Sequence, residues 1–145
     1  MYAVGEAFRE AIKENSRNYY YTGSIFTKDV KEYPFTNNDI VKGSGYLTSQ
    51  CSGNTEIELG TVYASELGIT LYSDIDRYSL QGGTISLLFH LQLKDGSYET
   101  VPMGIYEISE ANRTIKCLEI RAYDFMLRLE KKFNHTLTSG TPYEI

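Results

Sequence analysis

The segment from Thr84 to Leu93, TISLLFHLQL, constrains the fold of this chain more than any other stretch. Its apolar side chains recur at every second position, which is the period of a β-strand that buries one face. The sequence therefore predicts a long strand in a sheet with one buried side. The apolar face holds Ile85, Leu87, Phe89, Leu91 and Leu93, and the opposite face holds Ser86, Leu88, His90 and Gln92.

Several further segments alternate in the same way or are rich in β-branched and aromatic residues, and they predict strands that accompany this one. In ELGITLYS, for example, Leu67, Ile69 and Leu71 share one face. The predicted strands, in chain order, are 18–27, 55–60, 66–73, 84–93, 98–102, 104–109 and 114–122.

The connections between these strands carry turn signals. Asp95-Gly96 predicts a tight hairpin, and Pro102 is expected to end the next strand because proline has no amide N–H to donate. EANR at 110–113 predicts a further turn. Residues 28–45 predict a loop that contains one helical turn from Asp39 to Lys42, capped by Asn38.

The last predicted strand, TIKCLEIRA, has a break in its period. Ile115 and Cys117 fall in one phase, whereas Leu118, Ile120 and Ala122 fall in the other. One extra residue would return both halves to the same face of the sheet. A β-bulge is therefore expected near Cys117.

A helix is predicted near each end of the chain. The first runs from Glu6 to Glu14, with apolar residues at helical spacing. The second lies in AYDFMLRLEKKF at 122–133, whose apolar residues follow the i, i+3, i+4, i+7, i+11 pattern of a helix packed on a sheet. The residues of this second stripe are Ala122, Phe125, Met126, Leu129 and Phe133.

Together these elements predict a mainly β (α+β) fold of five to seven antiparallel strands. A small antiparallel β-barrel or curved sandwich, with an N-terminal and a C-terminal helix packed on it, is the natural way to bury one face of each strand. The length of 145 residues fits a single domain, 1–145.

Composition excludes several functions. The net charge is −5 and the basic residues are scattered, so no nucleic-acid partner is expected. No stretch reaches the ~20 apolar residues of a membrane helix, so no membrane association is expected either. Cys51 and Cys117 are expected to be buried thiols. His90 and His135 lie 45 positions apart with no partner at metal-ligand spacing.

No catalytic, cofactor-binding or metal-binding residues are predicted, and the chain is not expected to be an enzyme. The 13 tyrosines are its most unusual feature, because tyrosine is favoured in protein interfaces and in sugar sites. A tyrosine-rich carbohydrate-binding or adhesion module with a β-sandwich fold is one alternative. A small barrel enzyme or ligand carrier is another, and it would need a deep cavity around His90 or a pairing of Glu107 with Glu119. The residues predicted to form an interface are Tyr19, Tyr21, Leu88, His90 and Gln92.

The last five residues, TPYEI, have the form of a helix start. Thr141 suits an N-cap, Pro142 suits the first helical turn, and Glu144 completes a capping box. Because a capping box serves a helix that follows it, the sequence predicts a fragment cut from a longer chain near 134–145.

The order of the motifs resembles the N-terminal region of tail hub proteins, the tail-tip and baseplate hub proteins of phages and prophages of Gram-positive bacteria. The resemblance extends over nearly the whole chain, and none of its motifs is a catalytic signature. The motifs that carry it are Asp39-Ile40 with Gly43-Ser44, Glu58-Leu59-Gly60, Asp95-Gly96 with Pro102 and Gly104, and Ala122-Tyr123-Asp124.

The resemblance implies a β-barrel that belongs to a larger hub protomer, located in the virion tail and assembled in the cytoplasm of the bacterial host. It implies a homotrimeric ring that joins the tail tube to the tip. Its implied neighbours are the distal tail or tube protein and the tape-measure protein, and no cofactor is implied. In this family the first barrel can also take back a segment from later in the chain, which would leave a sheet edge unpaired in a shorter chain.

Overall fold

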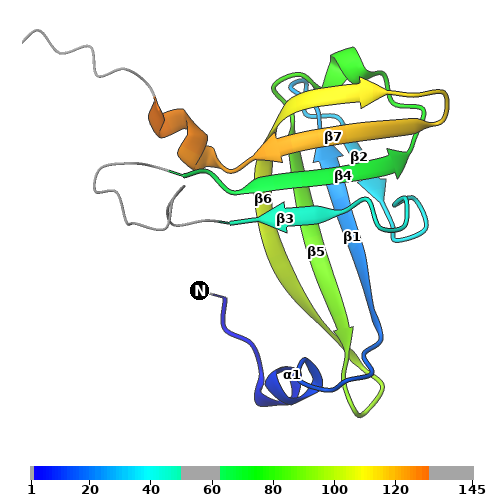
Figure 1. Ribbon diagram of the computed structural model, residues 1–145, viewed down its shortest axis with the longest axis vertical. Helices are drawn as coiled ribbons and strands as arrows, with labels where there is room; N and C mark the ends of the chain where they lie inside the picture. The colour runs from blue at the N-terminus through cyan, green and yellow to red at the C-terminus, as the bar shows by residue number, and fades with distance from the viewer. Residues whose placement is uncertain (1, 50–62, 131–145) are drawn as a thin grey trace, which may run out of the picture.

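A computed structural model describes residues 2–49 and 63–130 of the chain. Within these residues the fold is one seven-stranded antiparallel sheet in the order β2-β1-β5-β6-β7-β4-β3, with short helical segments beside it (Figure 1). The strand predicted at 55–60 and the C-terminal connector lie outside the described residues. The elements are α1 (Glu6–Ala11), β1 (Tyr19–Phe26), β2 (Glu32–Phe35), β3 (Tyr46–Thr48), β4 (Glu66–Tyr72), the 3-10 helix η1 (Arg77–Leu80), β5 (Thr84–Gln92), β6 (Tyr98–Arg113), β7 (Cys117–Tyr123) and the 3-10 helix η2 (Phe125–Glu130).

The sheet bends at β6, the longest strand. Its first part pairs with β5 and its last part pairs with β7, and the two pairings meet at Glu107. The register shifts by one residue at Met103 and again at Ser109. Each such bulge adds one unpaired residue, bends the strand and increases its twist. Gly104 follows the first bulge with a φ of 136°, a backbone angle that side chains disfavour.

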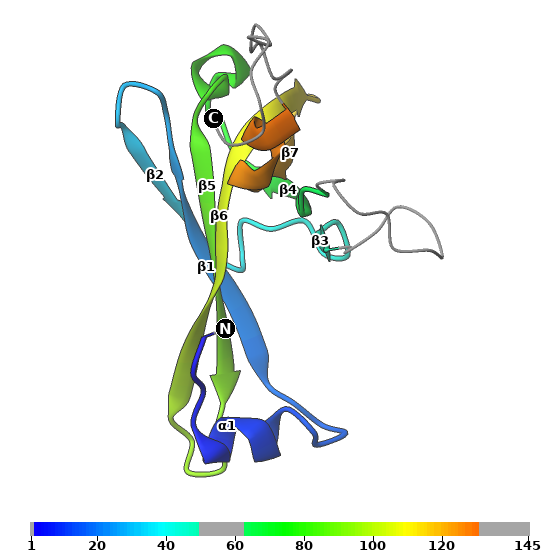
Figure 2. The ribbon, with the colours of Figure 1, turned by 90° about the vertical axis from the view of Figure 1, so that its left-hand side faces the viewer.

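Because of this bend, the two ends of the sheet face each other across one core (Figure 2). Strands that are far apart in the sheet order therefore contribute to the same hydrophobic cluster. Burying each large aliphatic or aromatic side chain contributes about 1.5–3 kcal/mol relative to leaving it exposed. The buried residues of this cluster are Ile25, Phe35, Leu67, Ile69, Leu71, Leu80, Ile85, Leu87, Tyr106, Ile108, Leu118, Ile120 and Ala122.

The predicted barrel does not close in the described part of the chain. The edge strands β2 and β3 do not pair with each other, and both are short. The chain crosses between these edges through residues 39–41. There the Val41 N–H donates to the Thr70 carbonyl over 2.9 Å, and the Tyr72 N–H donates to the Asp39 carbonyl over 2.7 Å. The fold is thus a curved open sheet.

The structure overturns several local predictions around β6 and β7. Pro102 does not end the strand, because it lies beside the first bulge, where a ladder hydrogen bond is not required. Residues 110–113 continue β6, and the turn falls at 114–116. Ile115 in this turn is 95% exposed. The inward phase of β7 is therefore set by Leu118, Ile120 and Ala122. The bulge predicted near Cys117 is wrong, because β7 pairs with β4 without a register shift and the shift between β6 and β7 lies at Ser109 in β6.

The helices and edge strands also differ from expectation. Helix α1 starts at Glu6 as predicted but ends at Ala11. The described part of 122–133 contains a 3-10 helix, η2, whose apolar side chains are exposed, so the predicted packed C-terminal α-helix is wrong for these residues. Residues 28–45 contain strand β2, and the backbone turns at 37–39 rather than forming a helical turn from Asp39 to Lys42. Strand β3 was not predicted, because its three exposed residues have no clear period.

Gly23 should be intolerant of any side chain. It is buried in β1, and an added Cβ would overlap the Ser86 carbonyl oxygen and the Phe35 ring. We expect Gly23→Ala to lower the free energy of unfolding by about 1–3 kcal/mol in urea denaturation, because the core cannot absorb the methyl group without shifting. Gly45→Ala is the matched control, since a Cβ there meets no atom within 4 Å. Equal losses in the two variants would contradict the described packing.

Candidate functional site

Strands β1 and β5 and the first part of β6 extend below the rest of the sheet as a three-stranded arm (Figure 2). Strand β2 pairs only with the second half of β1, from Gly23 to Phe26, so the first half has β5 as its neighbour. Helix α1 covers one face of the arm, where Phe8 and Ala11 pack with the fully buried Leu91. The helix is also held at its start, because the Gly5 N–H donates to the Glu99 carboxylate over 2.9 Å.

The five residues predicted as an interface lie on two opposite faces of this arm. Tyr19 and Tyr21 oppose Leu91 and Phe89 in the register and share the face that α1 covers. Their rings lie 5.6 and 5.3 Å from that of Phe89. The other face holds Leu88, His90 and Gln92. The structure therefore does not bring the two tyrosines together with the other three residues.

The partner of His90 is Tyr20, which the sequence did not single out. The two rings stack with centroids 4.4 Å apart and an interplanar angle of 11°. The His90 ring nitrogens hydrogen bond to Thr22 Oγ1 at 2.7 Å and to Thr100 Oγ1 at 2.8 Å, which links three strands. Burial lowers the pKa of His90 below its ordinary value, because the charged ring is less well solvated there. Only the strand register, which sequence does not give, identifies Tyr20 as the residue opposite His90.

An apolar groove lies where β1, beyond its pairing with β2, approaches β3. It has a volume of about 120 Å³, and its lining includes Tyr21 from β1 and Leu47 from β3. Leu87 and Met103 also line it. The Tyr21 N–H is directed to this side and donates to Asn37 Oδ1 over 3.4 Å. The groove is thus the place where the curved sheet stays open.

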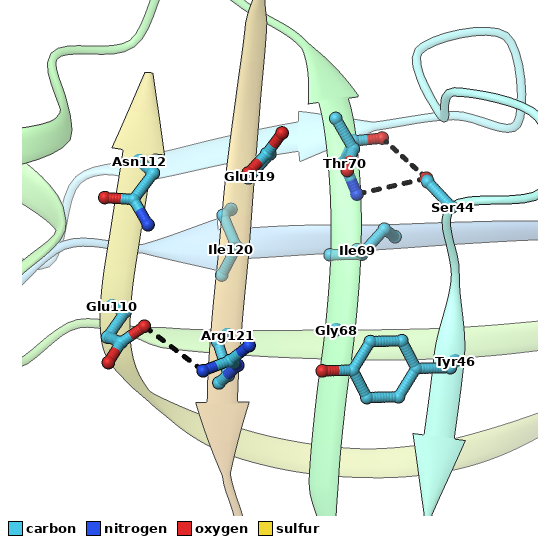
Figure 3. Close-up of a pocket in the computed structure, with 10 residues that line it drawn as sticks. All are labelled: Ser44, Tyr46, Gly68, Ile69, Thr70, Glu110, Asn112, Glu119, Ile120 and Arg121. Carbon is cyan, nitrogen blue, oxygen red and sulfur yellow. Dashed lines mark hydrogen bonds and ion pairs between the residues drawn. The ribbon is translucent and has the colours of Figure 1, made fainter. Parts of the chain in front are cut away.

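The outer face of β3, β4, β7 and the end of β6 carries a second, polar hollow (Figure 3). The Tyr46 ring lies flat over Gly68, where a Cβ would overlap it. The Tyr46 hydroxyl donates to Glu66 over 2.5 Å. Arg121 makes ion pairs with Glu66 at 3.2 Å and Glu110 at 3.4 Å. The hollow has a volume of about 140 Å³, and its rim also includes Ser44, Thr70, Asn112 and Glu119.

The groups around this hollow favour the protonated, positively charged form of Arg121. Its interaction with the Tyr46 hydroxyl, followed by the negative charges of Glu110 and Glu66, raises the pKa of Arg121 above its ordinary value. Arg121 is therefore a fixed cation between two carboxylates. Glu119 lines the same hollow and makes no hydrogen bond or ion pair with any described residue.

The pairing of Glu107 with Glu119 that a barrel enzyme was expected to need is not formed among the described residues. Glu107 pairs with Arg128 at 2.8 Å, whereas Glu119 lies at the polar hollow. His90 is half-buried on the arm and lines neither the apolar groove nor the polar hollow. Among the described residues no group of three or more His, Cys, Asp or Glu side chains is arranged to hold a metal ion. Cys117 is a free thiol but only half-buried, so its predicted full burial is wrong, and Cys51 lies outside the described residues.

None of the helices in residues 2–49 and 63–130 is long and apolar enough to cross a membrane.

Comparisons with known proteins identify the fold. No protein-family model matches the chain, and no curated protein matches its sequence. Among solved structures, the virion of the native gene transfer agent (GTA) particle contains a chain of similar fold. The superposition has a TM-score of 0.57 with 9% sequence identity. It covers 91% of this chain and 49% of the neighbour's chain, so this chain spans about half of that protein's length. At this identity the likeness establishes a shared fold.

The environment of His90 predicts a specific pH dependence of stability. The folded-state pKa of His90 is lowered, whereas the unfolded chain has an ordinary histidine pKa of about 6.5. The unfolded state therefore binds the proton more tightly, and stability is lost as the pH falls through about 6.5 toward the folded-state pKa. When the pH is lowered from about 8 to about 5, we expect the melting temperature of the wild-type chain to fall more than that of His90→Gln. Parallel melting temperatures for the two proteins across this range would contradict the assignment.

Proposed function

We propose that this chain is a structural component of the tail tip or baseplate hub of a phage or prophage, where it forms part of the ring that joins the tail tube to the tip. The observation that carries the proposal is the fold shared with a chain of a gene transfer agent virion. The motif order that resembles tail hub proteins supports it independently. Only about half of the neighbour's chain is matched, which agrees with a hub protomer that contains further domains.

The surfaces of the described residues suit assembly better than catalysis. The sheet has an open side next to β1, an apolar groove along it, and several exposed apolar side chains at its ends. Open strand edges and exposed apolar patches mark sites where polypeptides associate. Such surfaces allow a ring subunit to contact its neighbours over wide areas. The exposed apolar residues of η2 are Phe125, Met126, Leu127 and Leu129.

The proposed partners follow from this role. They are two further copies of the protomer in a homotrimeric ring, the distal tail or tube protein, and the tape-measure protein. Location in the virion tail, after assembly in the bacterial host cytoplasm, belongs to the same proposal. The proposed function requires no catalytic residue, cofactor, nucleic acid or membrane.

The alternative of a carbohydrate-binding module receives less support. Such a module would present two or three coplanar tyrosines along a groove. The rings of Tyr19 and Tyr21 are instead inclined by 80° to each other, and both pack against Phe89. Tyr20 stacks on His90 and meets Tyr98 at an interplanar angle of 63°, so these rings do not form a coplanar row.

The proposal predicts that the chain is found in particles and is needed to build them. Deleting its coding region from the source genome should give particles that lack normal tails, because a tube without its hub has no tip on which to assemble. Electron microscopy of induced cultures, with mass spectrometry of purified particles, would measure this. The control is the same deletion with the gene supplied in trans. Normal tails in the deletion strain, together with the absence of the chain from wild-type particles, would refute the proposal.

A further inference from the structure

The outer face of the three-stranded arm carries no charged side chain, although charged residues make up 23% of the chain. It is the face opposite to helix α1, and the strand register places its residues side by side across β1, β5 and β6. They occupy the even-numbered positions from 20 to 24 in β1 and from 86 to 92 in β5, and positions 98, 100, 102 and 105 in β6. Solvent-facing sheet surfaces normally carry charges, which oppose unwanted association. This outer arm face lacks that protection.

Charged residues border the outer arm face and pair among themselves. Glu107 pairs with Arg128 at 2.8 Å, and Lys94 pairs with both Glu10 and Glu14 at 3.4 Å. An uncharged centre with a charged border is the usual composition of a protein interface. The bordering charged residues are Glu32, whose carboxylate accepts a hydrogen bond from Ser24, Glu107 of β6, and Arg17, Lys94 and Asp95 at the tip of the arm.

The polar side chains of this face are already hydrogen bonded within the sheet. Asn18, next to β1, donates from its side-chain amide to Gln92 Oε1 over 2.9 Å, and Ser86 Oγ donates to the Ser24 carbonyl over 3.3 Å. His90 bonds to threonines of both neighbouring strands. Burying a polar group is costly chiefly where the group loses its hydrogen bonds. A partner can therefore cover the face without leaving these groups unsatisfied.

Apolar groups occupy much of the remaining outer arm face. Tyr98 is 46% exposed and Ile105 is 54% exposed. Pro102, also exposed, lies between them along β6 and is paired in the register with the half-buried Leu88. Removing such surface from water favours association.

His90 is the residue of this face that can gain a charge near neutral pH. Burial lowers the pKa of His90 below its ordinary value. The other titratable groups of the face are Tyr20 of β1 and Tyr98 of β6, and no carboxylate, ammonium or guanidinium group lies on it. The outer arm face is therefore uncharged at neutral pH.

A flat, uncharged face fits a partner surface of the same kind. A charged side chain buried against it would lose its water and gain no opposite charge. A saccharide fits less well, because Tyr20 stacks on His90 and meets Tyr98 at an angle of 63°. A second copy of the same face would give a two-fold pair, which does not build the proposed ring of three.

From these observations we infer that the outer arm face binds a flat, uncharged surface of a protein other than this chain. Leu88 and His90 of the central strand β5 lie in the middle of the contact, and Tyr98 and Ile105 of β6 lie toward its two ends. The inference adds a partner-binding surface to the proposed tail component. It rests on that proposed function for the exclusion of a second copy.

Site-specific cross-linking tests this contact directly. The photoreactive residue p-benzoylphenylalanine would replace Tyr98 in the protein produced in its source cells, and mass spectrometry would identify the cross-linked products. We expect one main product with a different protein, at a surface segment without Asp, Glu, Lys or Arg. Tyr72, which is 54% exposed on β4, is the matched control position and should not give this product.

A charge introduced into the outer arm face gives an independent test. Ile105→Lys should lower the yield of the cross-link from position 98 about tenfold or more, because its ammonium group would be buried without a partner. Ile115→Lys is the matched control, since Ile115 is 95% exposed in the turn before β7 and lies outside the face. Circular dichroism would confirm that both variants are folded.

Three results would overturn the inference. These are the absence of a product from position 98, a product with a second copy of the chain or with a charged segment, and equal yields from Ile105→Lys and Ile115→Lys. A product with an uncharged surface of a protein that is absent from particles would support the contact and count against the tail role. The deletion experiment tests that role without reference to this face.

Discussion

The bend of β6 determines the rest of this structure. A flat sheet could bury one face only by packing against another layer, whereas the two bulges in β6 turn the sheet back on itself. The inward-pointing residues of β6 change from odd to even positions at the first bulge and back to odd positions at the second. They are Val101 before the first bulge, Tyr106 and Ile108 between the bulges, and Ala111 after the second. One strand thus supplies both halves of the core. The bend also leaves β1 and β3 apart, which creates the open side and the apolar groove.

How much the sequence predicts depends on whether an element follows one period. Strands β1, β4 and β5 were predicted correctly, because each alternates without interruption and buries its apolar phase. Strand β6 was divided into two strands and a turn, because its phase changes at Met103 and Ser109. The apolar spacing of residues 122–133 has a helical period. These apolar residues nevertheless do not pack on the sheet as one helical face, because Ala122 belongs to β7 and the apolar residues of η2 are exposed.

The candidate surfaces were less predictable than the fold, because they depend on the strand register and on the close approach of residues from different strands. Alternation alone places Leu88, His90 and Gln92 on one face, but it does not reveal that Tyr20 stacks on His90. The polar hollow depends on Gly68, which allows the Tyr46 ring to lie on β4. These two residues lie in different strands, and one of those strands has no sequence signature. Both surfaces, like the open side of the sheet, fit a subunit whose role is to contact other proteins.

Amide hydrogen exchange across residues 98–113, measured by NMR on the 145-residue chain, tests this account most directly. If β6 is one bent strand that joins both halves of a single core, its paired amides on either side of Met103 and Ser109 should exchange together, through global unfolding. Rapid exchange of one half while the other stays protected would contradict the account, because the two halves of the sheet would then be separate units.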